Sequence, residues 1–208
     1  MTIHTIGNNT DHTSRTVRLK TATKEAHEEL DRFIMQANPF ADREHYGRFL
    51  AMQFLFHRDL DALFFDPYLA ALLPDLAGRR RLTFIHQDFS DLGIVVPDTR
   101  GAPRFAEGTS VDLSEALGWL YVIEGSNLGA AFLLKYAGRI GLDEEFGARH
   151  LAGASEGRGL HWKTFTAALD AVDLNERQEQ RIVQASQEAF ARVRALAQLS
   201  FPAPASSE

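Results

Sequence analysis

The sequence predicts a single all-α domain, a bundle of several helices. Apolar residues recur at spacings of three and four over long segments, and no segment sustains the alternation typical of a strand. The 208 residues also suit one domain of ordinary size, and no internal domain linker or repeat of fixed period divides them. We therefore expect one helical domain over residues 15–200, between flexible ends at 1–14 and 201–208.

Composition and charge narrow the function classes. A formal net charge of −6 gives no electrostatic reason to expect nucleic acid or an anionic membrane as a partner, and the basic run 79–81 is expected on a solvated helix face. No apolar run reaches the roughly 18 residues of a membrane span, and the polar segment 1–13 lacks the order of a secretory signal. Cysteine is absent, which excludes disulfides, thiolate metal ligands and cysteine nucleophiles. We expect a cytoplasmic monomer without nucleic-acid or membrane partners.

Capping residues and periodicity place the helices of the first half. A helix starts after Ser14, its N-cap, and ends near residue 37, before an Asn-Pro pair. A second opens at Asp42 and keeps the 3.6-residue period through residue 64. A short helix is expected over 67–73, and another over 76–92, stopped by a glycine.

The second half contains the longest helix. Residues 95–108, rich in Pro and Gly, are expected to form a loop. The long helix then begins after a cap at Ser110 or Asp112 and ends near residue 140, before a glycine. Two further helices are expected over residues 160–171 and 175–199.

A pair of glycines, Gly125 and Gly129, lies in the middle of this longest helix. Each interior glycine costs about 1 kcal/mol relative to alanine, so their positions need an explanation. They are four residues apart, about 6 Å along the axis, and share one face with Tyr121, Phe132 and Tyr136. The face is a bare strip of backbone, wide enough for a flat ligand or for a second helix packed by small-residue contact.

Eight histidines are present, but none belongs to a zinc-type or di-iron motif, which leaves ligation of a metal by a single histidine or no metal at all. His27 is the best candidate, because Asp31 lies one turn later and Lys20 two turns earlier on the same helix face. A carboxylate there could fix the imidazole tautomer, and the lysine could meet an anionic edge. A structural histidine is the alternative reading.

Gln53 and His57 form a polar pair at i and i+4 on the second helix, either an ordinary buried pair or part of a site. The joint occurrence of a histidine on one helix and a bare strip on another favours a planar cofactor between two helices. Such a cofactor would be ligated from one side and open on the other.

Four segments resemble one family. LKTATKEAH at 19–27 resembles the proximal-helix motif of heme oxygenases, and GWLYVIEGSNLGAAF at 118–132 is similar to the distal-helix motif of their bacterial branch. Segments 146–151 and 161–165 are also similar to that branch, and the resemblance extends in order from about residue 15 to 200. It implies a heme oxygenase-like bundle with heme between a proximal and a distal helix. The activity implied is reductive, O2-dependent cleavage of heme at a meso carbon, giving biliverdin, ferrous iron and CO.

The resemblance also implies roles for individual residues. His27 would be the axial iron ligand, with Asp31 behind it, and Lys20 would bind a heme propionate. Gly125 and Gly129 would line the distal face. The other residues implied in the site are Ser126 and Asn127 as a distal polar network, Gln53 and His57 as residues that order distal water, and Tyr121, Phe132 and Phe190 as heme contacts. The chain departs from some bacterial members at Val193, where they place a tyrosine near the propionates, and Arg192 or Arg194 is a candidate substitute.

Cofactors and partners follow from the same resemblance. Heme b would be both substrate and cofactor, with O2 and with electrons from an external reductase, a ferredoxin or an NADPH-dependent donor. The expected partners are that electron donor and a biliverdin acceptor such as a bilin photoreceptor. A non-catalytic helical heme carrier or sensor is the alternative function. The position of ring cleavage, the donor, and the choice between iron acquisition and chromophore supply stay open.

Overall fold

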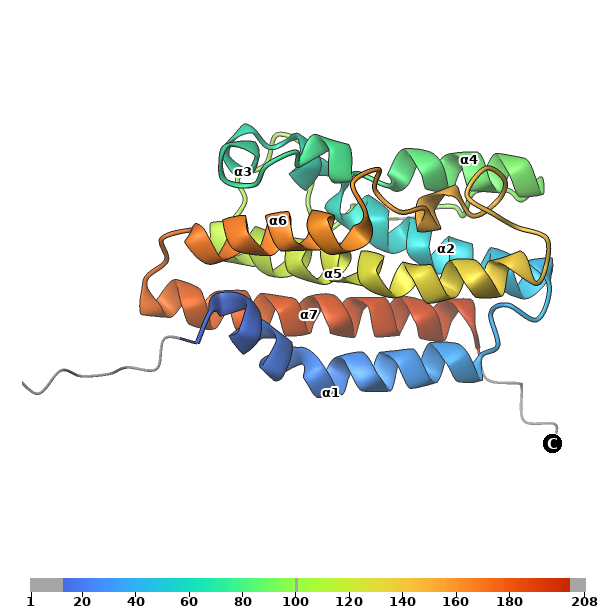
Figure 1. Cartoon of the computed structure of the whole chain (residues 1–208), viewed down its shortest axis with the longest axis horizontal. Helices are drawn as coiled ribbons and strands as arrows, with labels where there is room; N and C mark the ends of the chain where they lie inside the picture. Colours follow the sequence, from blue (N-terminus) through green and yellow to red (C-terminus); the bar gives the residue numbers. More distant parts are fainter. Residues whose placement is uncertain (1–12, 100, 203–208) are drawn as a thin grey trace, which may run out of the picture.

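A computed structural model describes residues 13–99 and 101–202, and the expected flexible ends lie largely outside that part of the chain. The described residues form seven α-helices and three short 3-10 helices (Figure 1). The α-helices are α1 (Arg15–Gln36), α2 (Arg43–Leu60), α3 (Pro67–Leu72), α4 (Leu82–Leu92), α5 (Leu113–Gly138), α6 (Arg158–Ala171) and α7 (Glu176–Ser200). The 3-10 helices are η1 (Asp61–Phe65), η2 (Ala77–Arg79) and η3 (Arg149–Leu151). No strand occurs in the described ranges, so the predicted all-α class is confirmed.

Helix α5 is the centre of the bundle and packs against α2, α6 and α7 (Figure 1). Helix α1 packs on the other side of α7, so α1 and α5 share α7 as a common support. One large apolar core joins these helices, and a smaller cluster between α2 and α4 consists of Leu50, Phe54, Leu82, Ile85 and Phe89. Burial of these faces, rather than local propensity, supplies most of the helical stability.

Four of the predicted helix starts are confirmed by side-chain caps. Ser14 accepts a hydrogen bond from the backbone of Val17, and Asp42 accepts one from His45 at 2.8 Å. Asp112, rather than Ser110, caps α5. Asn175 and its third helical neighbour cap one another reciprocally at the start of α7. Each cap satisfies a donor that would otherwise lack a partner in the first turn.

One predicted helix is wrong in its extent. Residues 76–92 do not form a continuous helix, because η2 ends at Arg79 and α4 begins only at Leu82. The reason is that Arg79 and Arg81 are 2% and 8% exposed, which also contradicts the prediction of a solvated helix face for residues 79–81. Arg79 donates to the carbonyl of Pro74 and to Glu124 on α5. The helical path is interrupted at Arg80, whose backbone is extended (φ −63°, ψ 131°).

Two smaller differences concern 3-10 turns. The second predicted helix ends as α2 at Leu60, and its last residues form η1. The glycine-containing segment before α6 contains η3, which the sequence did not predict. Residues 95–99 and 101–108 form no helix, in agreement with the predicted loop.

Helix α5 is the one described helix that is long and apolar enough to cross a membrane by length and composition. Its position explains this composition, because half of the apolar window is buried inside the bundle. Glu124, near its middle, is 2% exposed and pairs with Arg79 inside the protein. The apolar character of α5 is therefore that of a core helix.

Candidate functional site

The three glycines in the middle of α5 lie in different surroundings. A Cβ atom at Gly118 would lie 2.7 Å from the carbonyl oxygen of Ile182 on α7, so this glycine permits close helix packing. A Cβ atom at Gly125 would lie 3.6 Å from the Trp162 ring, an ordinary contact. A Cβ atom at Gly129 would meet nothing within 4 Å. Packing between described helices thus accounts for Gly118 and leaves Gly129 unexplained.

His27 lies on the exposed face of α1, with a side chain that is 59% exposed. Its Nε2 atom is 3.5 Å from Asp31 Oδ2, one turn further along the helix. The ring also contacts the edge of Phe190 on α7, with 5.7 Å between ring centroids. The imidazole thus contacts Phe190 at one edge and Asp31 at Nε2, while the rest of the ring faces solvent.

A direct contact sets the relative position of α1 and α5. The side chains of Thr23 and Tyr121 interact, and both residues are buried. The two helices run in the same direction across the bundle (Figure 1). His27 and Gly125 each lie one helical turn beyond the Thr23–Tyr121 contact, so they lie at the same level on either side of the space between α1 and α5.

Apolar side chains are exposed on the α5 side of this space. Leu128 is 40% exposed and Phe132 is 67% exposed, although both belong to the most apolar helix of the protein. Together with the bare backbone of Gly129 they form an exposed apolar surface on α5. The surfaces on α1 and α5 fit a flat, largely apolar ligand.

The other predicted polar residues of α5 make contacts within the protein. Ser126 Oγ donates to the carbonyl of Ile123 at 2.6 Å. The backbone carbonyl of Asn127 accepts from Arg158 Nη1 at 2.8 Å. On α1, Lys20 is exposed. No observation here assigns these three residues to a ligand, and their roles stay predictions.

The residues around Val193 are placed as follows. Val193 is 8% exposed and belongs to the core. Arg192 Nε is 2.7 Å from Asp59, and Arg194 forms an ion pair with Glu29. Both arginines therefore have acidic partners in this structure.

His57 belongs to a buried polar cluster beneath α2, whereas Gln53 is half-buried above it. Burial, together with the nearby His150 and Arg81, lowers the pKa of His57 to about 3. His57 Nδ1 and His150 Nε2 have no hydrogen-bond partner, nor does the buried Tyr46 hydroxyl. Buried polar atoms without protein partners are the usual sites of internal water, so this cluster fits the predicted role in ordering water.

Sequence reasoning missed a second buried network, behind α5. Arg79 Nη1 donates to Glu124 Oε2 at 2.7 Å, and His161 Nε2 lies 3.5 Å from the same oxygen. His161 Nδ1 lies 2.7 Å from Glu156. The nearby Glu124 carboxylate raises the pKa of His161, and Glu156 acts in the same direction. The one sequence signal was Glu124 in an apolar helix immediately before Gly125, since a buried carboxylate requires a cation.

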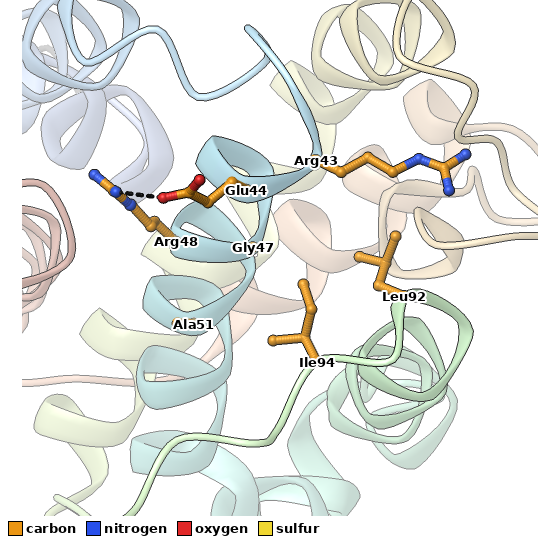
Figure 2. A pocket seen from close by; sticks show the side chains of 7 residues that line it. All are labelled: Arg43, Glu44, Gly47, Arg48, Ala51, Leu92 and Ile94. Atoms are coloured by element: carbon orange, nitrogen blue, oxygen red, sulfur yellow. Dashed lines mark hydrogen bonds and ion pairs between the residues drawn. The ribbon is translucent and has the colours of Figure 1, made fainter.

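A separate groove of about 450 Å³ lies between α2 and the end of α4 (Figure 2). Its lining residues are Arg43, Glu44, Gly47, Arg48, Ala51, Leu92 and Ile94. Figure 2 shows Ile94 and Leu92 facing the groove, while Arg48 turns back to pair with Glu44. None of the predicted site residues lines this groove, so it is distinct from the space between α1 and α5.

These features define an all-α protein with an exposed histidine on α1 and an open, apolar surface beside Gly129 on α5. The sequence matches the family model for heme oxygenase over residues 13–198. It is 44% identical over 187 residues to heme oxygenase PigA of Pseudomonas aeruginosa, and the match covers 90% of this chain and 93% of that protein.

Solved structures agree with the sequence match. The heme oxygenase of Neisseria meningitidis, determined with NO and CO bound, has a TM-score of 0.85 at 36% identity, covering 94% of this chain and 96% of that one. Heme oxygenase 2 from Chlamydomonas reinhardtii, determined without heme, has a TM-score of 0.71 at 17% identity, a likeness in fold that covers 93% of this chain and all of that one. The chain belongs to the heme oxygenase family. It is an enzyme that degrades heme, and cleavage of heme to biliverdin is the activity of the family.

Proposed function

We propose that heme binds between α1 and α5, with His27 as the axial ligand of the iron and the backbone at Gly125 and Gly129 over the opposite face. The observation that carries this assignment is Gly129. No described group lies within 4 Å of a Cβ atom there, so helix packing does not require a glycine at this position. The exposed Phe132 beside it and the outward-facing His27 supply the apolar and ligating surfaces that heme requires.

His27 can ligate iron as a neutral imidazole. Asp31 lies close enough to orient the ring from one nitrogen, which leaves the second nitrogen for the metal. Phe190 restrains the ring from the α7 side. Bound heme supplies the redox-active iron and is itself the ring that is opened, with release of iron and CO.

The residues on the α5 side act mainly through the absence of a side chain. Glycine at 125 and 129 brings backbone close to the distal face and leaves no acidic or basic side chain over the iron. Such a surface would leave room for heme and for ordered water, and it would place no acidic side chain beside the ring. Ser126 and Asn127 are the polar groups of this segment, and the buried cluster around His57 would hold water that delivers protons.

Several finer assignments belong to the same proposal. Lys20, exposed two turns before His27, would pair with a heme propionate. Electrons would come from an external reductase, a ferredoxin or an NADPH-dependent donor. The protein would act as a cytoplasmic monomer, with a biliverdin acceptor such as a bilin photoreceptor as a further partner.

The proposal is tested by adding hemin and then ascorbate or a reductase to the purified protein in air. Conversion to biliverdin, with the isomer identified chromatographically, supports it. Heme that is recovered intact would instead support the alternative, a heme carrier or sensor, because such a protein needs the same ligand but no distal reaction surface.

His27→Ala tests the ligand assignment. The variant should lose the absorption spectrum of histidine-ligated ferric heme and should stop producing biliverdin. His86→Ala is the control, since His86 is exposed on α4 and contacts Phe54 rather than the α1–α5 space. An unchanged spectrum and unchanged turnover in His27→Ala would show that another group ligates the iron.

A further inference from the structure

We propose that the first turn of α6 is a clamp that positions the glycine-bearing segment of α5, with Arg158, His161 and Trp162 as its positioning residues. The consequence of this clamp for heme chemistry rests on the proposed function, whereas its effect on the backbone position of α5 does not.

Arg158 makes the central contact of the clamp. Its Nη1 donates to the carbonyl of Asn127 at 2.8 Å, and its Nη2 donates to the carbonyl of Leu151 beside η3. A helix carbonyl has two lone pairs and can accept this extra donor while it remains in the helix. Asn127 lies between Gly125 and Gly129, where the backbone of α5 is least restrained by side chains. The guanidinium thus restrains the part of α5 that its own side chains restrain least.

His161 and Trp162 hold the residues immediately before Asn127. His161 Nε2 lies 3.5 Å from the buried Glu124 carboxylate, and its backbone carbonyl accepts from Arg79 Nη2 at 3.2 Å. The Trp162 ring covers Gly125 and lies 5.7 Å, centroid to centroid, from the Tyr121 ring. Three side chains from one turn of α6 therefore contact α5 within a single stretch of seven residues, 121–127.

The clamp contacts α5 on one side and just before Gly129. Trp162 and His161 contact the α6 side of α5, and Gly129 one turn later has open space in place of a side chain. A shift of α6 would therefore move the backbone around Gly129 relative to the space between α1 and α5. We infer that α6 sets the distance between the distal backbone and the heme, although none of its three clamp residues needs to touch heme.

The test is hydrogen–deuterium exchange of the heme-free protein, comparing the wild type with Arg158→Gln, Arg158→Lys and Lys163→Gln. Lys163 is exposed on the same turn of α6 and serves as the matched control. Amides 126–131 of Arg158→Gln should exchange about 10-fold faster, as expected for the loss of a charged hydrogen bond, while amides 114–120 keep their rates. Arg158→Lys retains one donor and should give an intermediate rate. Equal rates at 126–131 in Arg158→Gln and Lys163→Gln would overturn the proposal.

A second variant covers the case in which Arg158→Gln unfolds throughout. Trp162→Phe keeps the aromatic contact with Tyr121 but removes the ring atoms that face Gly125. Faster exchange confined to residues around 125 would support the clamp. Wild-type exchange there in both Trp162→Phe and Arg158→Lys would refute it.

The heme arm uses the same variants loaded with hemin. Arg158→Gln should shift the acid–alkaline transition of the ferric heme spectrum and lower kcat several-fold with little change in KM, because the distal surface moves while the ligand stays. A spectrum and kcat equal to those of Lys163→Gln would refute control of the distal surface by α6. If the wild type itself fails to convert heme, the proposed function fails, and the exchange experiment still decides the clamp.

Discussion

Replacing His57 by glutamine should make the protein markedly more resistant to acid. The imidazole is 5% exposed, and burial holds its pKa at about 3 in the folded protein, against about 6.5 in an unfolded chain. Between these values the unfolded state binds a proton that the folded state excludes. Stability is therefore lost as the pH falls below 6.5, and the loss is complete only near pH 3.

The size of the effect follows from the two pKa values. Each pH unit between them costs about 1.4 kcal/mol, and the onset near pH 6.5 is gradual. Integration from pH 7 to pH 4.5 gives a loss of about 2.5 kcal/mol from His57 alone. Such a loss is a large fraction of the 5–15 kcal/mol by which small proteins are typically stable.

The measurement is urea unfolding of the heme-free protein at pH 7 and pH 4.5, followed by far-UV circular dichroism. Carboxylates also titrate in this range, so the informative quantity is the difference in acid loss between the wild type and His57→Gln. His86→Gln, a replacement of an exposed histidine on α4, controls for a general effect of removing an imidazole. If the wild type and His57→Gln lose the same free energy between the two pH values, His57 is not kept neutral by burial and the reasoning is wrong.

Three further predictions follow from the glycines and from the start of α1. Gly118→Ala should destabilise the protein by about 1–3 kcal/mol in urea unfolding, because its Cβ would meet the backbone of α7 at 2.7 Å; unchanged stability would contradict the packing described here. Gly129→Ala should stabilise the heme-free protein by about 0.5–1 kcal/mol and yet slow biliverdin formation, and a loss of stability would show that packing had been missed. Arg15→Ala should cost about 3 kcal/mol, since it removes one of the two arginines that pair with Glu179 and the donor to two carbonyls near the end of α6; a cost below 1 kcal/mol would show that water replaces these bonds.

The helix starts could be predicted from sequence because their causes are local. Ser14, Asp42 and Asn175 each cap a helix with a hydrogen bond to a backbone group three residues away. Such contacts depend on neighbouring residues alone, so the sequence contains all the information needed. The all-α class follows from periodicity in the same way.

The segment 79–81 could not be predicted because its cause is distant. Three consecutive arginines resemble a solvated surface run, and the partner of Arg79 is Glu124, which lies 45 positions further along the chain. Only the packed bundle brings them together. The same applies to Arg158, because its acceptor is a backbone carbonyl on α5. Every residue has such a carbonyl, so the residue type does not reveal the contact.

The candidate site was accessible from sequence where spacing along one helix decides the geometry. His27 and Asp31 are four residues apart, and the structure places them 3.5 Å from one another. Gly125 and Gly129 were likewise found as a pair on one face. Their different surroundings were not accessible, because these depend on Trp162, a residue from another helix.

The glycines of α5 all weaken the helix, but they differ in whether contacts within the protein offset that cost. At Gly118 the cost of glycine is offset by close contact with α7, so a structural explanation is sufficient. At Gly125 the Trp162 ring lies at ordinary contact distance, and an alanine methyl would fit with little movement. At Gly129 nothing in the described structure occupies the space that a side chain would fill. The glycine weakens the helix by about 1 kcal/mol, and no packing contact offsets this cost. The open space beside Gly129 is the observation behind the proposed heme position, and the contacts of α6 with this segment of α5 are proposed as part of the same site.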